Sequence, residues 1–284
     1  MSAATAPSLG QLVRGVSGVA TLPAVYFRIT AVIHRPDASL GEVGTVVKED
    51  TALTGRLLRL VNSSLFRVAK RIDTVSEAIQ VVGLSQLEDL ALGTTVIQVF
   101  KDVPSDLVNM DSFWRHSLAT AIGARLIAQQ RREANVERFF VAGLLHDIGR
   151  PVLYLREPDL SRQALEQARR QSRFLHEVEK EVFGYDHSAV GAELLRSWNI
   201  PPRVAEAVDW HHVPAGASRA GVEAAAVHVA DLFANALAVG TSGEHLVPQL
   251  APRAWEALGL HVDTVPVLLR TLEGQLEEVA GALL

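Results

Sequence analysis

Apolar residues recur three and four positions apart along most of the chain. Val25, Ile29 and Val32 show this spacing, as do Leu53 and Leu57. Because this period places apolar side chains on one face of an α-helix, it predicts helices that each bury one face. The two-residue alternation typical of strands is almost absent. The chain is therefore predicted to be an all-α, multi-helical protein.

Polar pairs and helix breakers indicate where these helices begin and end. In the Ser/Thr-x-x-Glu pattern, side chains satisfy backbone N–H groups at a helix start. The pairs are Ser39 with Glu42, Thr74 with Glu77, and Ser85 with Glu88. Breaks are expected at Pro36, Gly83, Pro104, Pro158, Gly184, Pro201–Pro202 and Pro248. They divide the chain into about a dozen helices.

The segment Pro104–Asp106 lies between two long amphipathic stretches and is the expected internal boundary. We expect a flexible N-terminus over 1–19, a helical sub-domain over 20–104, a second helical sub-domain over 105–240 and a C-terminal segment over 241–284. Eight of the ten histidines follow residue 140. Residues 241–250 read as a loop and Val265–Leu284 as a closing amphipathic helix, compatible with a homodimer or with packing back on the body.

Composition narrows the expected partners and location. The 284 residues include 27 Lys and Arg against 32 Asp and Glu, so no basic footprint suggests nucleic acid as a partner. The absence of Cys excludes disulfides, thiolate zinc sites and a cysteine nucleophile, and it fits a reducing interior. No apolar stretch approaches the roughly 18 residues of a membrane span. These features predict a cytoplasmic protein without a membrane partner, whose metal ligands would be nitrogen and oxygen.

The most informative segment, Val141–Arg150, is an apolar helix that ends in the pair His146–Asp147. Near a helix end both side chains can turn toward one ion, with Gly149 expected to end the helix. The pair offers one imidazole and one carboxylate. A buried hydrogen bond between the two residues would give the same pattern.

Four other places in the same half offer matching groups. They are His116, His187, the doublet His211–His212, and Asp231. Isolated histidines are more often core or surface residues than ligands, but the ordered set of five imidazoles and two carboxylates favours a single site. Such a donor set suits Fe, Mn, Ni, Co or Zn better than Mg or Ca. If the groups converge, Asp147 is expected to bridge two ions.

Two neighbouring residues each allow two interpretations. Arg150 either holds a substrate phosphate as a catalytic residue or is a helix C-terminal or surface charge. His228 either orients Asp231 or packs in the core. The histidines without companions in any pattern, His34, His176, His245 and His261, are expected to face solvent.

The order His116, His146–Asp147, Asp231 resembles the HD-domain metal-dependent phosphohydrolases. His187, His211 and His212 fall where two-metal members of that superfamily, including the HD-GYP phosphodiesterases, carry additional histidines. Upstream, Leu22–Pro23, the segment 50–63 ending in Asn62–Ser63, and the segment 72–83 resemble the HDOD family, the HD-related output domain. The likeness runs from about residue 20 to about residue 235.

This resemblance implies an HD-like helical bundle with an N-terminal helical sub-domain, and a bacterial signalling output. It also implies one or two divalent transition-metal ions. Two departures from HD-GYP enzymes are Arg150 in place of Lys and Val213–Ser218 in place of Gly-Tyr-Pro. Ser112 stands where trinuclear members place Glu, so at most two ions are expected.

Two functions remain open from the sequence. The first is a regulatory module that binds a signalling protein or a nucleotide and has no turnover. The second is a metal-dependent phosphohydrolase or phosphodiesterase acting on a nucleotide or cyclic dinucleotide. The first is favoured because residues that would hold a metal are present, whereas residues that would choose a substrate are not recognisable.

Overall fold

The structure is a computed structural model and describes residues 6–16, 21–100 and 103–284. These residues contain no strand, so the all-α prediction is confirmed. Within the same ranges, no helix is long and apolar enough to cross a membrane.

The N-terminal helices are α1 (Leu9–Val16), α2 (Ala24–Ile33), α3 (Leu40–Lys48), α4 (Thr51–Val61), α5 (Val75–Val82) and α6 (Leu84–Val96). The central ones are α7 (Met110–Gln130), α8 (Val136–Leu145), α9 (Gly149–Arg156), α10 (Pro158–Gln171), α11 (Leu175–Phe183), α12 (His187–Ser197), α13 (Pro202–Trp210) and α14 (Gly221–Ala236). The C-terminal ones are α15 (Pro252–Leu258) and α16 (Val265–Leu283), with short 3₁₀ turns η1 (Pro214–Gly216) and η2 (Val262–Thr264). This is more than the expected dozen, because short turns such as residues 146–148 break helices without a proline.

Two of the three predicted helix starts are confirmed. Ser39 with Glu42 and Thr74 with Glu77 form reciprocal caps at α3 and α5. The third prediction is wrong, since α6 begins at Leu84 and Ser85 lies inside its first turn. Gly83, with a φ of 86°, lies between α5 and α6 and turns the chain directly from one helix into the next.

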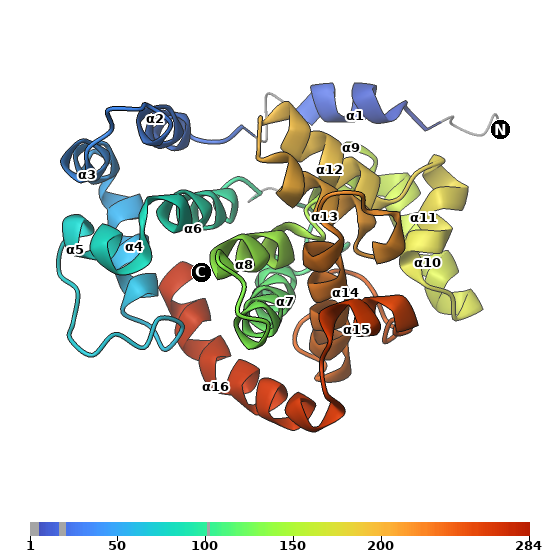
Figure 1. The fold of residues 1–284 in the computed structure, drawn as a ribbon. Coiled ribbons are helices and arrows are strands. Elements are labelled where there is room, and N and C mark those ends of the chain that lie inside the picture. Colours follow the sequence, from blue (N-terminus) through green and yellow to red (C-terminus); the bar gives the residue numbers. More distant parts are fainter. Residues whose placement is uncertain (1–5, 17–20, 101–102) are drawn as a thin grey trace.

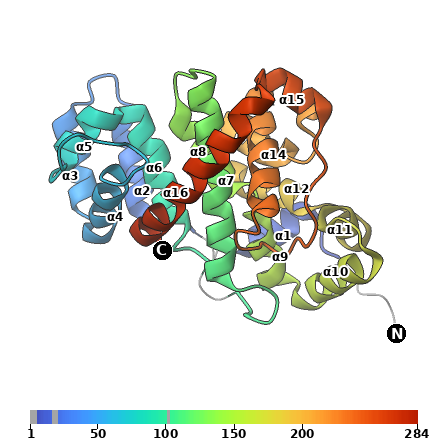
Figure 2. The same cartoon turned by 90° about the horizontal axis from the view of Figure 1, so that it is seen from below.

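Helices α7 and α8 lie between α2 to α6 on one side and α9 to α14 on the other, and α1 lies on the side of α9 and α12 (Figure 1). Helix α16 crosses α7 and reaches α4, as Figure 2 shows. Gln275 of α16 donates to the carbonyl of Ser64, whose N–H donates to Glu278. The C-terminal helix therefore packs back on the body, while the homodimer and the predicted sub-domain boundaries stay predictions.

The expectation of a flexible N-terminus over 1–19 is wrong for residues 6–16, and residues 1–5 and 17–20 lie outside the described ranges. Helix α1 packs on α9 and α12, and it buries Leu12 and Val13. Tyr185 also donates to the carbonyl of Pro7 at 2.8 Å. The apolar face of α1 thus holds this part of the N-terminal segment against the body.

The Asn62–Ser63 turn after α4 is held by its own side chains. The Asn62 amide donates to the carbonyls of Leu58 and Ile72 and accepts from the N–H of Ile72, at 2.7–2.8 Å. The turn presents the carbonyl of Leu65 to Arg125 of α7 at 2.8 Å. Arg125 is buried and paired with the carboxylate of Glu137 on α8. A side-chain network therefore ties the N-terminal helices to the helix pair that leads to the histidines.

Asp89 of α6 is a buried carboxylate with one neutral partner, the Asn135 amide at 2.9 Å. Burial raises the pKa of Asp89 to about 6, although the Asn135 hydrogen bond opposes the rise. Because the folded pKa exceeds the unfolded one, the native state binds the extra proton. Its contribution to stability is present below about pH 4 and is lost as the pH rises through 6.

We expect Asp89→Asn to raise the free energy of unfolding at pH 7.5 by about 1–3 kcal/mol and to change it little at pH 4. Urea denaturation followed by circular dichroism at the two pH values measures this. Glu273→Gln, an exposed site on α16, is the control and should show no such difference. An equal effect of Asp89→Asn at both pH values would contradict the assignment.

Gly149 lets α9 approach the first residue of α12. A Cβ at this position would lie 2.0 Å from the carbonyl oxygen of His187 and 2.7 Å from the amide nitrogen of Gly191. Both are backbone atoms, so no side-chain rotation relieves the overlap. The glycine was expected to end a helix, but it begins α9 instead, and its role is this close contact.

We expect Gly149→Ala to destabilise the protein by at least about 2–3 kcal/mol, because it forces two packed helices apart. Thermal unfolding measures the loss. Gly274→Ala on α16, where an added Cβ meets nothing within 4 Å, is the matched control and should not destabilise. A Gly149→Ala protein as stable as the wild type would refute the packing argument.

Candidate metal centre

The structure brings all seven predicted ligand residues together. His116 comes from α7, His146 and Asp147 from the turn between α8 and α9, His187 from the start of α12, His211 and His212 from directly after α13, and Asp231 from α14. All are buried except His212, which is half-buried. Within the described residues, these side chains form three overlapping groups that can each hold a metal ion.

One half of the centre consists of His116, His146 and Asp231. The Asp231 Oδ1 atom lies 3.1 Å from His116 Nε2 and 3.6 Å from His146 Nε2. The Asn235 amide, one turn further along α14, donates to the same Asp231 oxygen at 2.7 Å. The carboxylate is therefore fixed in its orientation toward the two imidazoles.

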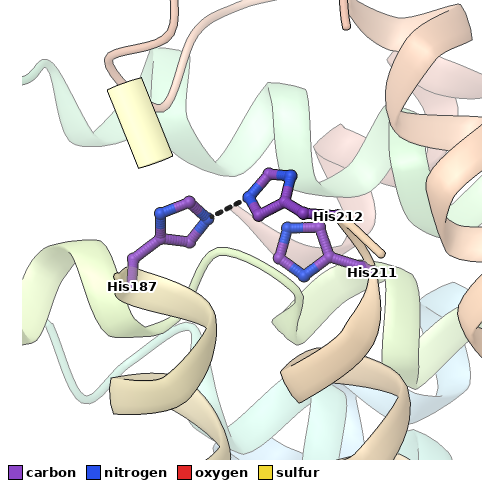
Figure 3. A group of neighbouring side chains, drawn as sticks. All are labelled: His187, His211 and His212. Carbon is purple, nitrogen blue, oxygen red and sulfur yellow. Dashed lines mark hydrogen bonds between the residues drawn. The ribbon is translucent and has the colours of Figure 1, made fainter. Parts of the chain in front are cut away.

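The other half consists of His187, His211 and His212 (Figure 3). The Nε2 atoms of His187 and His212 lie 3.0 Å apart, which requires a proton or a cation between two ring nitrogens. The rings of His211 and His212 are also close, with centroids 3.9 Å apart.

Asp147 lies between the two halves and directs one oxygen to each. Its Oδ2 atom is 3.2 Å from His146 Nε2 and 3.8 Å from His116 Nε2. Its Oδ1 atom is 2.8 Å from His187 Nε2 and 3.9 Å from His211 Nε2. This is the arrangement that a carboxylate bridging two ions requires.

Hydrogen bonds behind the rings set which nitrogen faces the centre. His146 and His211 place Nδ1 2.7 Å from the carbonyls of Gly143 and Val208, so Nδ1 donates to a carbonyl and Nε2 is the nitrogen that faces the centre. His187 Nδ1 lies 2.5 Å from Glu179 Oε2, which also accepts from the His187 backbone N–H. Sequence reasoning missed Glu179, because a lone acidic residue on amphipathic α11 carries no signal of its role.

Carboxylates outweigh burial at two of the imidazoles in the centre. Burial disfavours a charged His146 ring, but the Asp147 and Asp231 carboxylates outweigh it and raise the pKa of His146 to about 10. Burial and the Arg150 charge likewise oppose protonation of His187, yet Glu179 and Asp147 raise its pKa to about 9. A field that holds protons on two buried imidazoles also attracts a metal cation, which would replace those protons.

The remaining groups respond to the same charges. Burial and the charges on His146 and His187 lower the pKa of His211 to about 3, so this ring is neutral. Burial opposes ionisation of Asp147, but Arg150 and the adjacent imidazoles hold its pKa well below its ordinary value. The ring of His211 and the carboxylate of Asp147 are thus already in the forms that bind metals, whereas His146 and His187 would give up a proton to the ion.

The donor atoms fit a metal ion. Among the described residues, both ring nitrogens of His116 and the Nε2 atoms of His146 and His211 are buried without a hydrogen-bonding partner. Leaving such an atom unpaired costs about 1–3 kcal/mol. A divalent transition-metal ion would satisfy these nitrogens together with the carboxylate oxygens.

Arg150 is buried beside the centre, so the interpretations as a surface charge or a helix C-terminal charge are wrong. Its Nη1 atom lies 3.4 Å from Asp147 Oδ2, and its Nε atom lies 3.7 Å from Glu179 Oε1. It also donates to the hydroxyl of Ser242. The reason is local: a short turn follows α8, and α9 begins at Gly149, which directs Arg150 inward at a helix start.

A cavity of about 340 Å³ adjoins the centre. Its lining includes Asp147, Arg150, His212, Asp231 and residues of the predicted loop 241–250, which is confirmed as non-helical. The expectation that His176 faces solvent is wrong, since it lines this cavity and is half-buried. Its ring stacks on His212 at 4.0 Å, and burial together with the His187 charge lowers the pKa of His176 to about 4.

His228 orients backbone rather than the Asp231 carboxylate. Its Nδ1 atom lies 2.9 Å from the carbonyl of His211, and its Nε2 atom accepts from the N–H of Ala251 at 3.0 Å. It therefore links the histidine doublet to the wall of the cavity. His34, His245 and His261 are exposed, as expected.

Comparison with known proteins places this geometry in a family. A curated relative, an uncharacterized protein of Treponema pallidum, is 26% identical over 198 residues, which are 69% of this chain and 38% of that protein. The chain thus spans well under two thirds of the relative's length.

Solved structures share the fold. An HDOD domain protein of unknown function from Geobacter sulfurreducens is 26% identical, with 96% of each chain covered and a TM-score of 0.75. A Shewanella amazonensis protein, named provisionally as a phosphohydrolase, is 23% identical, with 98% of this chain and 99% of the other covered and a TM-score of 0.78.

The family model of the HDOD domain matches residues 19–214, more than half of the chain. The match includes the Asn62–Ser63 turn and every member of the centre except Asp231. The resemblance seen in the sequence is therefore confirmed, and this chain belongs to the HDOD family.

Proposed function

We propose that this HDOD protein is a metal-dependent phosphohydrolase of bacterial signalling, acting on a phosphate ester of a nucleotide or cyclic dinucleotide. The observation that carries the proposal is the placement of Asp147: its two carboxylate oxygens face separate groups of buried imidazoles. A cytoplasmic location belongs to the same proposal.

Two divalent transition ions, drawn from Fe, Mn, Ni, Co and Zn, would share the Asp147 carboxylate. One would be held by His116, His146 and Asp231, and the other by His187, His211 and His212. When bound, such ions supply a water nucleophile at neutral pH and neutralise charge on a phosphoryl group.

The chain's own residues hold this arrangement in place. Glu179 fixes the ring of His187, Asn235 fixes Asp231, and Arg150 neutralises part of the Asp147 charge. Such outer contacts set the orientation and basicity of ligands, and their loss costs about 10–100-fold in metal affinity. Arg150 would also direct a guanidinium toward a phosphate entering the cavity, and this catalytic role is part of the proposal.

The charge of the cavity makes substrate binding depend on the ions. Its lining carries the carboxylates of Asp147, Glu177, Asp231 and Glu244 against the single guanidinium of Arg150. A phosphate would be repelled by this surface alone and attracted once two divalent cations are in place. Phosphate-ester binding is therefore expected only in the metal-loaded protein.

A second candidate function is a regulatory module that binds a signalling protein and has no turnover. One observation favours it: Arg150, the cavity's only guanidinium among the described residues, already contacts Asp147 and Ser242. In that case the ions would stabilise the fold, and recognition would take place on another surface, such as the helices of the N-terminal half.

We expect the purified protein to hold one to two transition-metal ions per chain, and Asp147→Ala to lose most of them because both halves share this carboxylate. Inductively coupled plasma mass spectrometry gives the stoichiometry. Asp159→Ala, on an exposed residue of α10, is the control and should retain the metal. Folded wild-type protein that stays metal-free after incubation with Mn²⁺, Fe²⁺ and Zn²⁺ would exclude the proposed centre.

We expect the metal-loaded protein to release product from at least one member of a panel of nucleotides, cyclic dinucleotides and a generic phosphodiester. His146→Ala should lower that rate by about a hundredfold or more, since it removes a ligand of the ion that stabilises developing charge. His261→Ala, an exposed histidine, should leave the rate unchanged. A fully metallated protein that is silent across the panel would favour the regulatory module.

A further inference from the structure

A second hollow, of about 490 Å³, lies away from the metal centre and is surrounded by arginines. Arg138 comes from α8, Arg203 from α13, Arg219 from the segment before α14, and Arg253 from α15. No residue that lines it also lines the cavity beside the metal centre. Four separate parts of the fold thus each contribute an arginine to the lining of one concave surface.

The positive charges of this hollow exceed the negative ones. Arg138 and Arg203 share a single carboxylate oxygen of buried Glu223, each at 2.9 Å. Arg219 and Arg253 are exposed, and their side chains make no hydrogen bond or ion pair with the described residues. The other lining carboxylate, Glu133, already pairs with Arg131, which lies outside the hollow. Two guanidinium groups are therefore free to bind an anion.

The helix dipoles reinforce this charge. Arg138 is the third residue of α8, Arg203 the second of α13 and Glu223 the third of α14. Because Glu223 contacts both arginines, the N-terminal ends of the three helices meet at this point. Each helix N-terminus carries a partial positive charge, so the three add to the potential of the guanidinium groups.

We propose that this hollow is a binding site for a small anion that carries two or more linked phosphates. Guanidinium forks bind phosphate oxygens in pairs, which favours phosphate over a singly charged anion. The concave shape and the volume, near the lower end for ligand pockets, favour a small molecule over a flat macromolecular partner. The site does not depend on the proposed chemistry of the metal centre.

Its position on the helices that carry metal ligands is suited to a regulatory role. Arg138 precedes His146 by eight residues, Arg203 precedes His211 by eight, and Glu223 precedes Asp231 by eight. Contacts at both ends show that α8, α13 and α14 run in parallel, with about 12 Å of helix between the hollow and the metal centre. The anion would thus bind at the N-terminal ends of the same three helices, about two turns before the metal ligands that these helices position.

Isothermal titration calorimetry of the full chain with inorganic triphosphate tests the site. The double variant Arg219→Gln/Arg253→Gln should weaken binding about tenfold or more, since it removes two charge-assisted contacts. Their side chains make no hydrogen bond or ion pair with the described residues, so the variant should keep the wild-type unfolding temperature. Arg169→Gln/Arg170→Gln, on exposed positions of α10, is the matched control and should bind as the wild type does.

Asp147→Ala separates this site from the metal centre. It should bind triphosphate within about twofold of the wild type, and hydrogen exchange should slow around Arg219 when the anion is added. Loss of binding in Asp147→Ala, with retention in the arginine double variant, would place the anion at the metal centre and overturn the proposal. No binding at millimolar triphosphate would also overturn it, whereas a protein without metal or activity would not.

Discussion

The charge of Asp147 must be balanced inside the protein, because only 2% of the residue's surface is exposed. An isolated carboxylate would be far too costly to bury at this depth, so cations must surround it. Arg150, His146 and His187 supply them from three sides. The positions of α8, α9 and α12 are all tied to this requirement.

The backbone meets this requirement by close approach. Gly149 brings α9 against the carbonyl of His187, and an added Cβ at Gly143 would lie 2.8 Å from the backbone of Ala121 on α7. These contacts place the His146–Asp147 turn within reach of α7 and α12 together. Glu179 and Asn235 then fix the side chains from behind. A centre assembled from five segments is thus rigid even though none of its residues is close to all the others in sequence.

Much of this arrangement could be predicted from the sequence, for identifiable reasons. Helical periodicity predicted the fold class. The order of His116, His146–Asp147 and Asp231 predicted which groups meet, because residue type and order can be read without knowing how the helices pack. The Ser39 and Thr74 caps were predictable because their hydrogen bonds are local.

Features that depend on tertiary contacts were not predictable in the same way. The burial of Arg150 depends on a turn that begins a new helix, and the role of Glu179 depends on where α11 packs. His176 was assigned to solvent because its partner, His212, is distant in sequence. The amphipathic face of α1 was missed because the first residues of a chain are usually loosely held, and the helices that α1 packs on, α9 and α12, are distant in sequence.

The parallel course of α8, α13 and α14 limits where residues can be inserted into or deleted from this chain. Each segment between a contact at one end and a ligand position at the other, 138–146, 203–211 and 223–231, spans a little over two helical turns. Deleting one residue inside such a segment would rotate one end against the other by about 100° and separate the groups at one end or the other. Insertions and deletions should therefore be confined to the connecting loops, and these three stretches should keep a fixed residue count even where their side chains are replaced.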